Sequence, residues 1–335
     1  MDKIINEIVN IVNKRDIRVV TICEPNHRSY TSHTFNHRLM MKIHKKTKID
    51  TFSSEKLGVF DGLMLQYYAK KRKKIPKDIE KNHIFSGLGT KRWLDYYTTQ
   101  DPESYNFVGA EFDSYNPYRY DKKIMEGIFS KDFVDSITDP MEGGGDISTV
   151  TKNDISAKES FDCIKDFYGN REKYWKKNIK KILEKYGTLF IVGYHLNKKD
   201  PIGKMIQKMY GEKCLFIGSC SYSISTQILI IENKYSKVHH FNEAIHNGDY
   251  EQIVLPVDKW APVTEFERKR EGNISLVKVT KKNQDKKIRL VGCYLAMTRK
   301  EYESCKKISQ VYFSLDHFDY VLFFRKSQYM ENMFL

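Results

Sequence analysis

Apolar positions recur at helical and at strand spacing in turn along much of the chain. Isoleucine and valine follow a helical period over residues 2–14, and an apolar run at 17–23 predicts a strand directly after that helix. Residues 170–185 predict an amphipathic helix that ends at Gly187. The near-continuous apolar run at 188–196 predicts a strand that is buried on both faces.

Further segments extend this alternation. A polar loop followed by a short basic helix is predicted over 24–46, and another helix over 58–70. Residues 201–210 predict a helix, whereas 214–234 predict two strands joined by a polar reversal. Strands that alternate with helices are typical of an α/β fold with a doubly wound, mostly parallel sheet. The two strands at 214–234 predict an antiparallel hairpin at its edge.

The pattern changes after about residue 236, where strand-like segments surround one predicted helix at 298–308. This change indicates a smaller C-terminal α+β region. We therefore predict three parts: an N-terminal helical and basic extension over 1–80, a Rossmann-like core over 81–235, and a C-terminal appendage over 236–335.

Composition narrows the class of protein. The chain has 335 residues, of which 40% are hydrophobic, so it can form a real core and is not globally disordered. No apolar run approaches the roughly 18 residues of a membrane-spanning helix, and the first residues lack the pattern of a secretory signal. We therefore predict no membrane partner. The six cysteines form no C-x-x-C pair, which predicts buried or free thiols in a reducing compartment and hence a cytoplasmic protein.

The chain is strongly basic, with a formal net charge of +14. This charge favours a polyanionic partner, RNA before DNA, although a lysine-rich composition also fits an AT-rich genome. A dense basic run near two tyrosines is the predicted contact with nucleic acid: Lys70, Lys71, Arg72, Lys73 and Lys74.

A glycine turn and two acids predict a nucleotide-like ligand. The segment HIFSGLGT at 83–90 is an apolar run that leads into Gly87 and Gly89, and a predicted helix follows. About 20–24 residues later, Glu111 and Asp113 stand at the end of the next predicted strand, where a carboxylate meets a ribose diol. The alternative is a structural turn and a solvated strand end.

The segment 83–234 resembles a class I S-adenosylmethionine-dependent methyltransferase, on order and pattern more than on any one motif. The segments that carry the resemblance are HIFSGLGT, FVGAEFD, FDCIKDF, the helix at 170–185, GTLFIVGYH and CLFIGSCSYSISTQILIIEN. It implies S-adenosylmethionine as cofactor, with Ser86, Gly87 and Gly89 along its methionine part and Glu111 or Asp113 on its ribose. Asp162, Lys165 and Asp166 would face the methyl acceptor; they also stand where charged groups line a ligand crevice.

This resemblance implies a methyltransferase that acts on nucleic acid, chiefly RNA and including the mRNA cap, similar in general terms to cap-modifying enzymes of large DNA viruses in the host cytoplasm. The alternative is a catalytically inactive, RNA-binding relative whose C-terminal region contacts a protein partner. A third interpretation is a nucleotidyl- or glycosyltransferase in which Glu111 and Asp113 bind a divalent metal. The histidine spacing of 24–46 is also compatible with zinc, but a polar basic helix explains it and we predict no metal site.

Overall fold

The computed structural model describes residues 1–24, 30–55, 105–110, 171–193, 196–221, 226–231, 250–255, 273–289, 294–299 and 312–324. The chain divides into two compact units. One unit comprises Met1, Cys23–Phe35 and Phe216–Asn332, and the other comprises Asp2–Ile22, Asn36–Leu215 and Met333–Leu335. The boundary between them falls within two strands, after Ile22 and after Leu215, and within a helix, after Phe35.

The main sheet has seven strands in the order β3-β2-β4-β1-β5-β12-β8. Their bounds are β1 Val19–Cys23, β2 Thr51–Ser54, β3 Asn106–Phe107, β4 Leu189–Gly193, β5 Cys214–Ser221, β8 Ile274–Lys278 and β12 Tyr320–Phe324. β2 is parallel to both β3 and β4, and β12 is parallel to β5. β12 and β8 are antiparallel, with Val321 opposite Val277. A mostly parallel α/β sheet with an antiparallel edge is thus confirmed.

Different segments from those predicted form the antiparallel edge. Residues 214–234 do not form a hairpin, because β5 lies inside the main sheet and β6 (Thr226–Ile231) belongs to another sheet. The physical reason is burial: β5 is buried from Cys214 to Cys220, so it pairs with strands on both sides. Gly218 also admits the Phe318 ring, since a Cβ there would lie 2.9 Å from ring carbons.

The main sheet takes strands from all three predicted parts of the chain. β1 and β2 come from residues 1–80, β4 and β5 from 81–235, and β8 and β12 from 236–335. All five residues of β1 are buried, as expected of an inner strand. Residues 1–80 are therefore more than a helical extension, because they supply two strands to this sheet.

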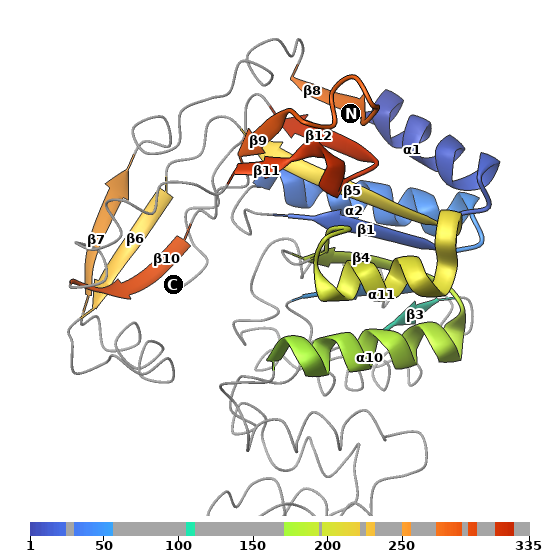
Figure 1. Cartoon of the computed structure of the whole chain (residues 1–335), viewed down its shortest axis with the longest axis horizontal. Helices are drawn as coiled ribbons and strands as arrows, with labels where there is room; N and C mark the ends of the chain where they lie inside the picture. Colours follow the sequence, from blue (N-terminus) through green and yellow to red (C-terminus); the bar gives the residue numbers. More distant parts are fainter. Residues whose placement is uncertain are drawn as a thin grey trace, which may run out of the picture. The chain divides into compact units, whose positions relative to one another are not determined.

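Four described helices flank the sheet: three were predicted from helical periodicity, and the fourth, α2, is longer than the short basic helix predicted within 24–46. They are α1 Asp2–Lys14, α2 Tyr30–Lys46, α10 Arg171–Tyr186 and α11 Pro201–Tyr210. The connection from β1 through α2 to β2 moves toward the β3 edge of the sheet, whereas the connection from β4 through α11 to β5 moves toward the β8 edge. Right-handed crossovers then place α2 and α11 on opposite faces, as Figure 1 shows. None of the helices in the described residues combines the length and apolar character that crossing a bilayer requires.

Neighbouring helices are tied together on each face. The Asn13 side chain of α1 donates a hydrogen bond to the Lys46 carbonyl of α2 at 2.9 Å. On the other face, the Tyr210 hydroxyl of α11 donates to the Leu183 carbonyl of α10 at 3.2 Å. The helix α10 ends as predicted at Gly187, whose φ of 74° suits glycine.

Two smaller sheets belong to the first unit. One has the order β10-β6-β7, with β10 (Tyr294–Thr298) parallel and β7 (Tyr250–Leu255) antiparallel to β6. The other pairs β9 (Lys287–Arg289) with β11 (Tyr312–Ser314) in antiparallel fashion. Short 3-10 turns, Gly211–Lys213 and Leu315–His317, precede β5 and β12.

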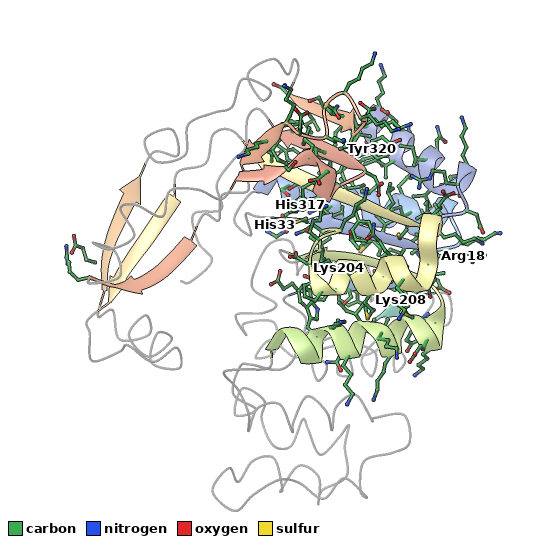
Figure 2. All side chains as sticks on the ribbon, viewed as in Figure 1. Arg18, His33, Lys204, Lys208, His317 and Tyr320 are labelled. Carbon is green, nitrogen blue, oxygen red and sulfur yellow. The ribbon has the colours of Figure 1, made fainter. Side chains whose placement is uncertain are left out.

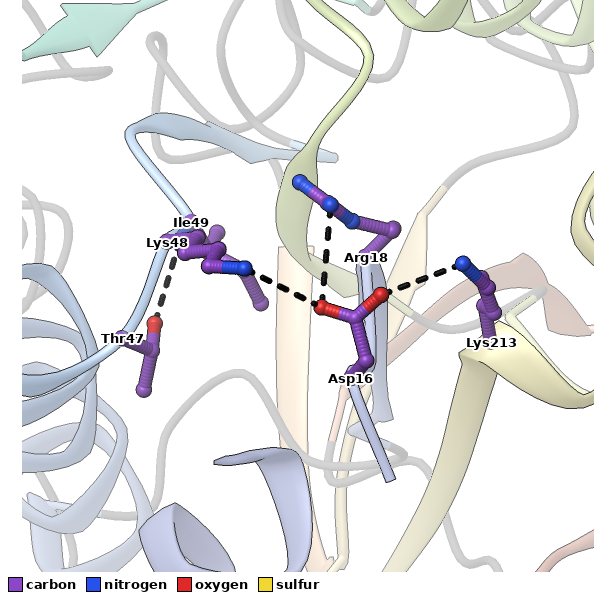
Figure 3. A network of polar contacts seen from close by, with 6 residues as sticks. All are labelled: Asp16, Arg18, Thr47, Lys48, Ile49 and Lys213. Atoms are coloured by element: carbon purple, nitrogen blue, oxygen red, sulfur yellow. Dashed lines mark hydrogen bonds and ion pairs between the residues drawn. The ribbon is translucent and has the colours of Figure 1, made fainter. Parts of the chain in front are cut away.

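A network of charges lies at the amino ends of the strands in the second unit (Figure 3). Asp16, just before β1, pairs with Lys213 at 3.1 Å, Arg18 at 3.6 Å and Lys48 at 3.7 Å. The hydrogen bond from Lys213 lowers the pKa of the Asp16 carboxyl below its usual value, and the nearby cations act in the same direction. These contacts join segments that are far apart in sequence, so we assign this end of the sheet a structural role.

Candidate functional site

The sheet topology points to the carboxyl ends of β4 and β1. These strands are neighbours, yet the helices that follow them, α11 and α2, lie on opposite faces. Such a change of face is a topological switch point, and open α/β sheets bind ligands just beyond the strand ends there. We therefore regard the residues that end or follow β2 and β4 as the candidate site.

Glu55 is the first residue after β2, and its side chain is only 6% exposed. Its backbone N–H donates a hydrogen bond to the Val192 carbonyl at 2.8 Å, so the β2–β4 ladder continues to this residue. The side chain lies against Gly193: a Cβ on that glycine would be 2.7 Å from the Glu55 Cβ and 2.9 Å from its Oε2. The Glu55 carboxylate thus occupies its place because residue 193 has no side chain.

The described chain resumes after β4 at Leu196, which contacts β1. The Thr21 hydroxyl of β1 donates a hydrogen bond to the buried Leu196 carbonyl at 3.2 Å. The next residue, Asn197, accepts hydrogen bonds through Oδ1 from the backbone of Lys199 at 2.9 Å and of Asp200 at 3.2 Å. Gly203 of α11 lies so close that a Cβ there would be 1.8 Å from the Asn197 carbonyl oxygen. These hydrogen bonds and the close approach of Gly203 fix the position of residues 196–200 beside β1 and α11.

In the first unit, Glu24 directly follows β1 and is 2% exposed. The Ser32 hydroxyl donates a hydrogen bond to Glu24 Oε1 at 2.7 Å, and Ser32 is equally buried. Ser32 lies in the first turn of α2, where the helix dipole favours a negative charge. The fold therefore stabilises this second buried carboxylate with a hydrogen-bond donor and a helix N-terminus.

These two glutamates can do acid–base chemistry. Each follows a strand directly, where a carboxylate can accept a proton from water or a hydroxyl, or orient an imidazole. In the part of the chain that the structure describes, no group of three or more His, Cys, Asp or Glu side chains is arranged to hold a metal ion.

The site residues that the sequence singled out lie in segments other than those that the structure describes. Those predicted for the cofactor, the methyl acceptor and nucleic acid all fall outside the described residues: Ser86, Gly87, Gly89, Glu111, Asp113, Asp162, Lys165, Asp166, Lys70, Lys71, Arg72, Lys73 and Lys74. Of the N-terminal histidines, His44 packs against Tyr105, with ring centroids 4.7 Å apart. Cys23, Cys214 and Cys220 are buried free thiols, as predicted.

Sequence reasoning missed both glutamates. Glu24 was assigned to a polar loop, although an acid that directly follows a fully apolar strand is a signal for a strand-end site. Glu55 follows a four-residue strand, Thr51–Ser54, whose composition carries no clear strand pattern. Only the pairing of β2 with β4 identifies its place.

Three solved structures have a similar fold. A protein from Bacillus cereus is 15% identical with a TM-score of 0.62, and the match covers 96% of this chain and 92% of that one. A succinoglycan biosynthesis protein is 14% identical with a TM-score of 0.60, over 95% and 90% of the two chains. A variant of an erythromycin esterase in its open conformation is 10% identical with a TM-score of 0.61, over 98% and 96%. No protein-family model and no curated protein matches the chain. These likenesses concern the fold.

Proposed function

We propose that the protein is a hydrolase that cleaves ester bonds, with Glu55 as its acid–base residue. The observation that carries this proposal is the buried Glu55 carboxylate set over Gly193 at the carboxyl ends of β2 and β4. The likeness in fold to an enzyme named as an erythromycin esterase, over nearly the whole of both chains, supports it.

In the proposed reaction, a water oxygen attacks the ester carbonyl while the Glu55 carboxylate accepts the proton of that water. The tetrahedral intermediate then collapses, the carbon–oxygen bond to the alcohol breaks, and the leaving oxygen takes the proton back. Gly193 positions Glu55, and the fixed turn that follows β4 keeps the strand end in place. General acid–base catalysis by one positioned carboxylate contributes about 10²–10⁴-fold.

Histidines adjoin both strand ends in the sequence. His27 comes three residues after Glu24, and His195 comes two residues after Gly193. An imidazole that donates a hydrogen bond to a carboxylate accepts protons well near neutral pH. We include His195 in the proposed machinery on its sequence position, two residues after Gly193.

The test is ester hydrolysis by the purified full-length chain. The substrates are p-nitrophenyl acetate, p-nitrophenyl butyrate and erythromycin, the last because a protein of similar fold carries that name. Glu55→Gln keeps the size of the side chain and removes its ability to accept a proton, so we expect kcat/KM to fall about 100-fold or more, mainly in kcat. The control is Glu184→Gln, which alters a half-exposed glutamate on α10 and should leave the rate unchanged.

Two results would overturn this proposal. One is a wild-type protein that is folded yet hydrolyses none of the three esters above the buffer rate. The other is an E55Q variant as active as the E184Q variant. The sequence-based prediction of a nucleic-acid methyltransferase stays a prediction, because its site residues lie outside the described residues. Calorimetric titration with S-adenosylmethionine tests it separately.

A further inference from the structure

The outer side of α10 and α11 is rich in lysine. On α10, the apolar side chains of Trp175, Ile179, Ile182 and Leu183 are buried. The remaining side of that helix carries five lysines, Lys176, Lys177, Lys180, Lys181 and Lys185. The adjacent helix α11 adds the exposed Lys204 and Lys208 (Figure 2). We call these seven residues the lysine face.

The spacing of these lysines is unfavourable for the helices taken alone. Lys177, Lys181 and Lys185 follow one another at i, i+4 and i+8, so they form a row along α10 with a rise of about 6 Å per step. Lys204 and Lys208 are likewise four residues apart. Like charges at this spacing destabilise a helix by about 0.2–0.5 kcal/mol per pair. Lys180 pairs with Glu184 at 3.5 Å.

The chemistry of the lysine face fits a linear polyanion. Lysine is a flexible point charge that suits phosphate oxygens and does not read base edges in a fixed geometry. A membrane-surface helix would instead turn an apolar face outward to enter the lipid. The apolar side of α10 is buried, and the exposed large hydrophobic residue found among the described residues is Met209 of α11.

We propose that the lysine face binds the phosphate backbone of nucleic acid without reading its sequence. This proposal is independent of the proposed ester hydrolysis and makes no use of the basic run at Lys70–Lys74. Its affinity comes from the release of counterions and therefore falls steeply with salt, by about 0.9 log units per log unit of salt for each phosphate that is neutralised.

The experiment measures binding of the full-length protein to fluorescein-labelled duplexes, two DNA and two RNA of unrelated sequence, by fluorescence anisotropy across a salt series. The test variant is K177Q/K181Q/K185Q. The matched control is K281Q/K282Q/K286Q, which removes the same charge from exposed lysines around the 281–285 turn. We expect the test variant to bind about tenfold more weakly or worse and its salt slope to fall by about 3, while the control stays close to wild type.

A folding control accompanies the comparison. The thermal unfolding midpoint of each triple variant should stay close to that of the wild type, because exposed charge contacts contribute little to stability. Equal weakening by both triple variants would mean that net charge alone drives binding, and that result overturns the proposal. So would an absence of binding at low salt, a clear preference among unrelated sequences, or binding to phosphatidylserine vesicles in place of the duplexes.

Discussion

For Gly193→Ala, strand propensity and the packing around residue 193 predict opposite changes in stability. Gly193 ends β4 and has no positive φ, so by propensity alone alanine should stabilise the strand by about 0.5–1 kcal/mol. Packing predicts the opposite, because the new Cβ would lie 2.7 Å from the Glu55 Cβ, 2.9 Å from its Oε2 and 3.2 Å from the Leu196 Cδ1. Ordinary carbon–carbon contacts are about 3.5–4.0 Å, so the overlap approaches about 1 Å.

Overlap of this size in a tightly packed region costs about 1–3 kcal/mol. We therefore expect Gly193→Ala to lower the free energy of unfolding by about 1–3 kcal/mol in urea denaturation. If Glu55 is the acid–base residue, kcat should fall as well, because the carboxylate must move.

A double-mutant cycle with Glu55→Gly isolates the contact. Glycine at position 55 removes both atoms that the new methyl group would meet first, so Gly193→Ala should cost little in that background. If Gly193→Ala costs the same with and without the Glu55 side chain, or if it stabilises the wild-type protein, the reasoning about this contact is refuted.

Two further predictions concern hydrogen bonds to carboxylates. Ser32→Ala removes the donor to the buried Glu24 and should lower the free energy of unfolding by about 1.5–3 kcal/mol in urea; an unchanged value would contradict the burial of this pair. Asp16→Asn keeps a residue that tolerates the φ of 47° but removes the charge that Lys213 and Arg18 face. Because folding lowers the pKa of Asp16, its contribution is present above the unfolded value near 3.8 and is lost as pH falls through the lower folded value. D16N should therefore be less stable than wild type at neutral pH and low salt. The difference should shrink as pH falls below the unfolded value and through the lower folded value, and a constant difference would exclude the ion pairs as its cause.

Local sequence patterns predicted the helices but not the residues of the candidate site. Periodicity predicted the helices 2–14, 170–185 and 201–210, since each carries its apolar face within one continuous segment. The strand β2 was not predicted, because its four residues, two of them serine, show no regular alternation of apolar and polar positions. Glu55 became a candidate only when β2 was found beside β4 and its carboxylate against Gly193.

Hydrophobic spacing was enough to predict the α/β class, the positions of α1, α10 and α11, and the buried character of the strand at 188–196. These properties depend on spacing within single segments, which tertiary contacts reinforce without altering. The pairing of strands and the contacts between polar groups depend on tertiary structure, because they join segments that are distant in the sequence. β5 pairs with β12, more than ninety residues further on, and not with its sequence neighbour β6. β5 is buried from Cys214 to Cys220, as expected of a strand inside a parallel sheet that has paired strands on both edges.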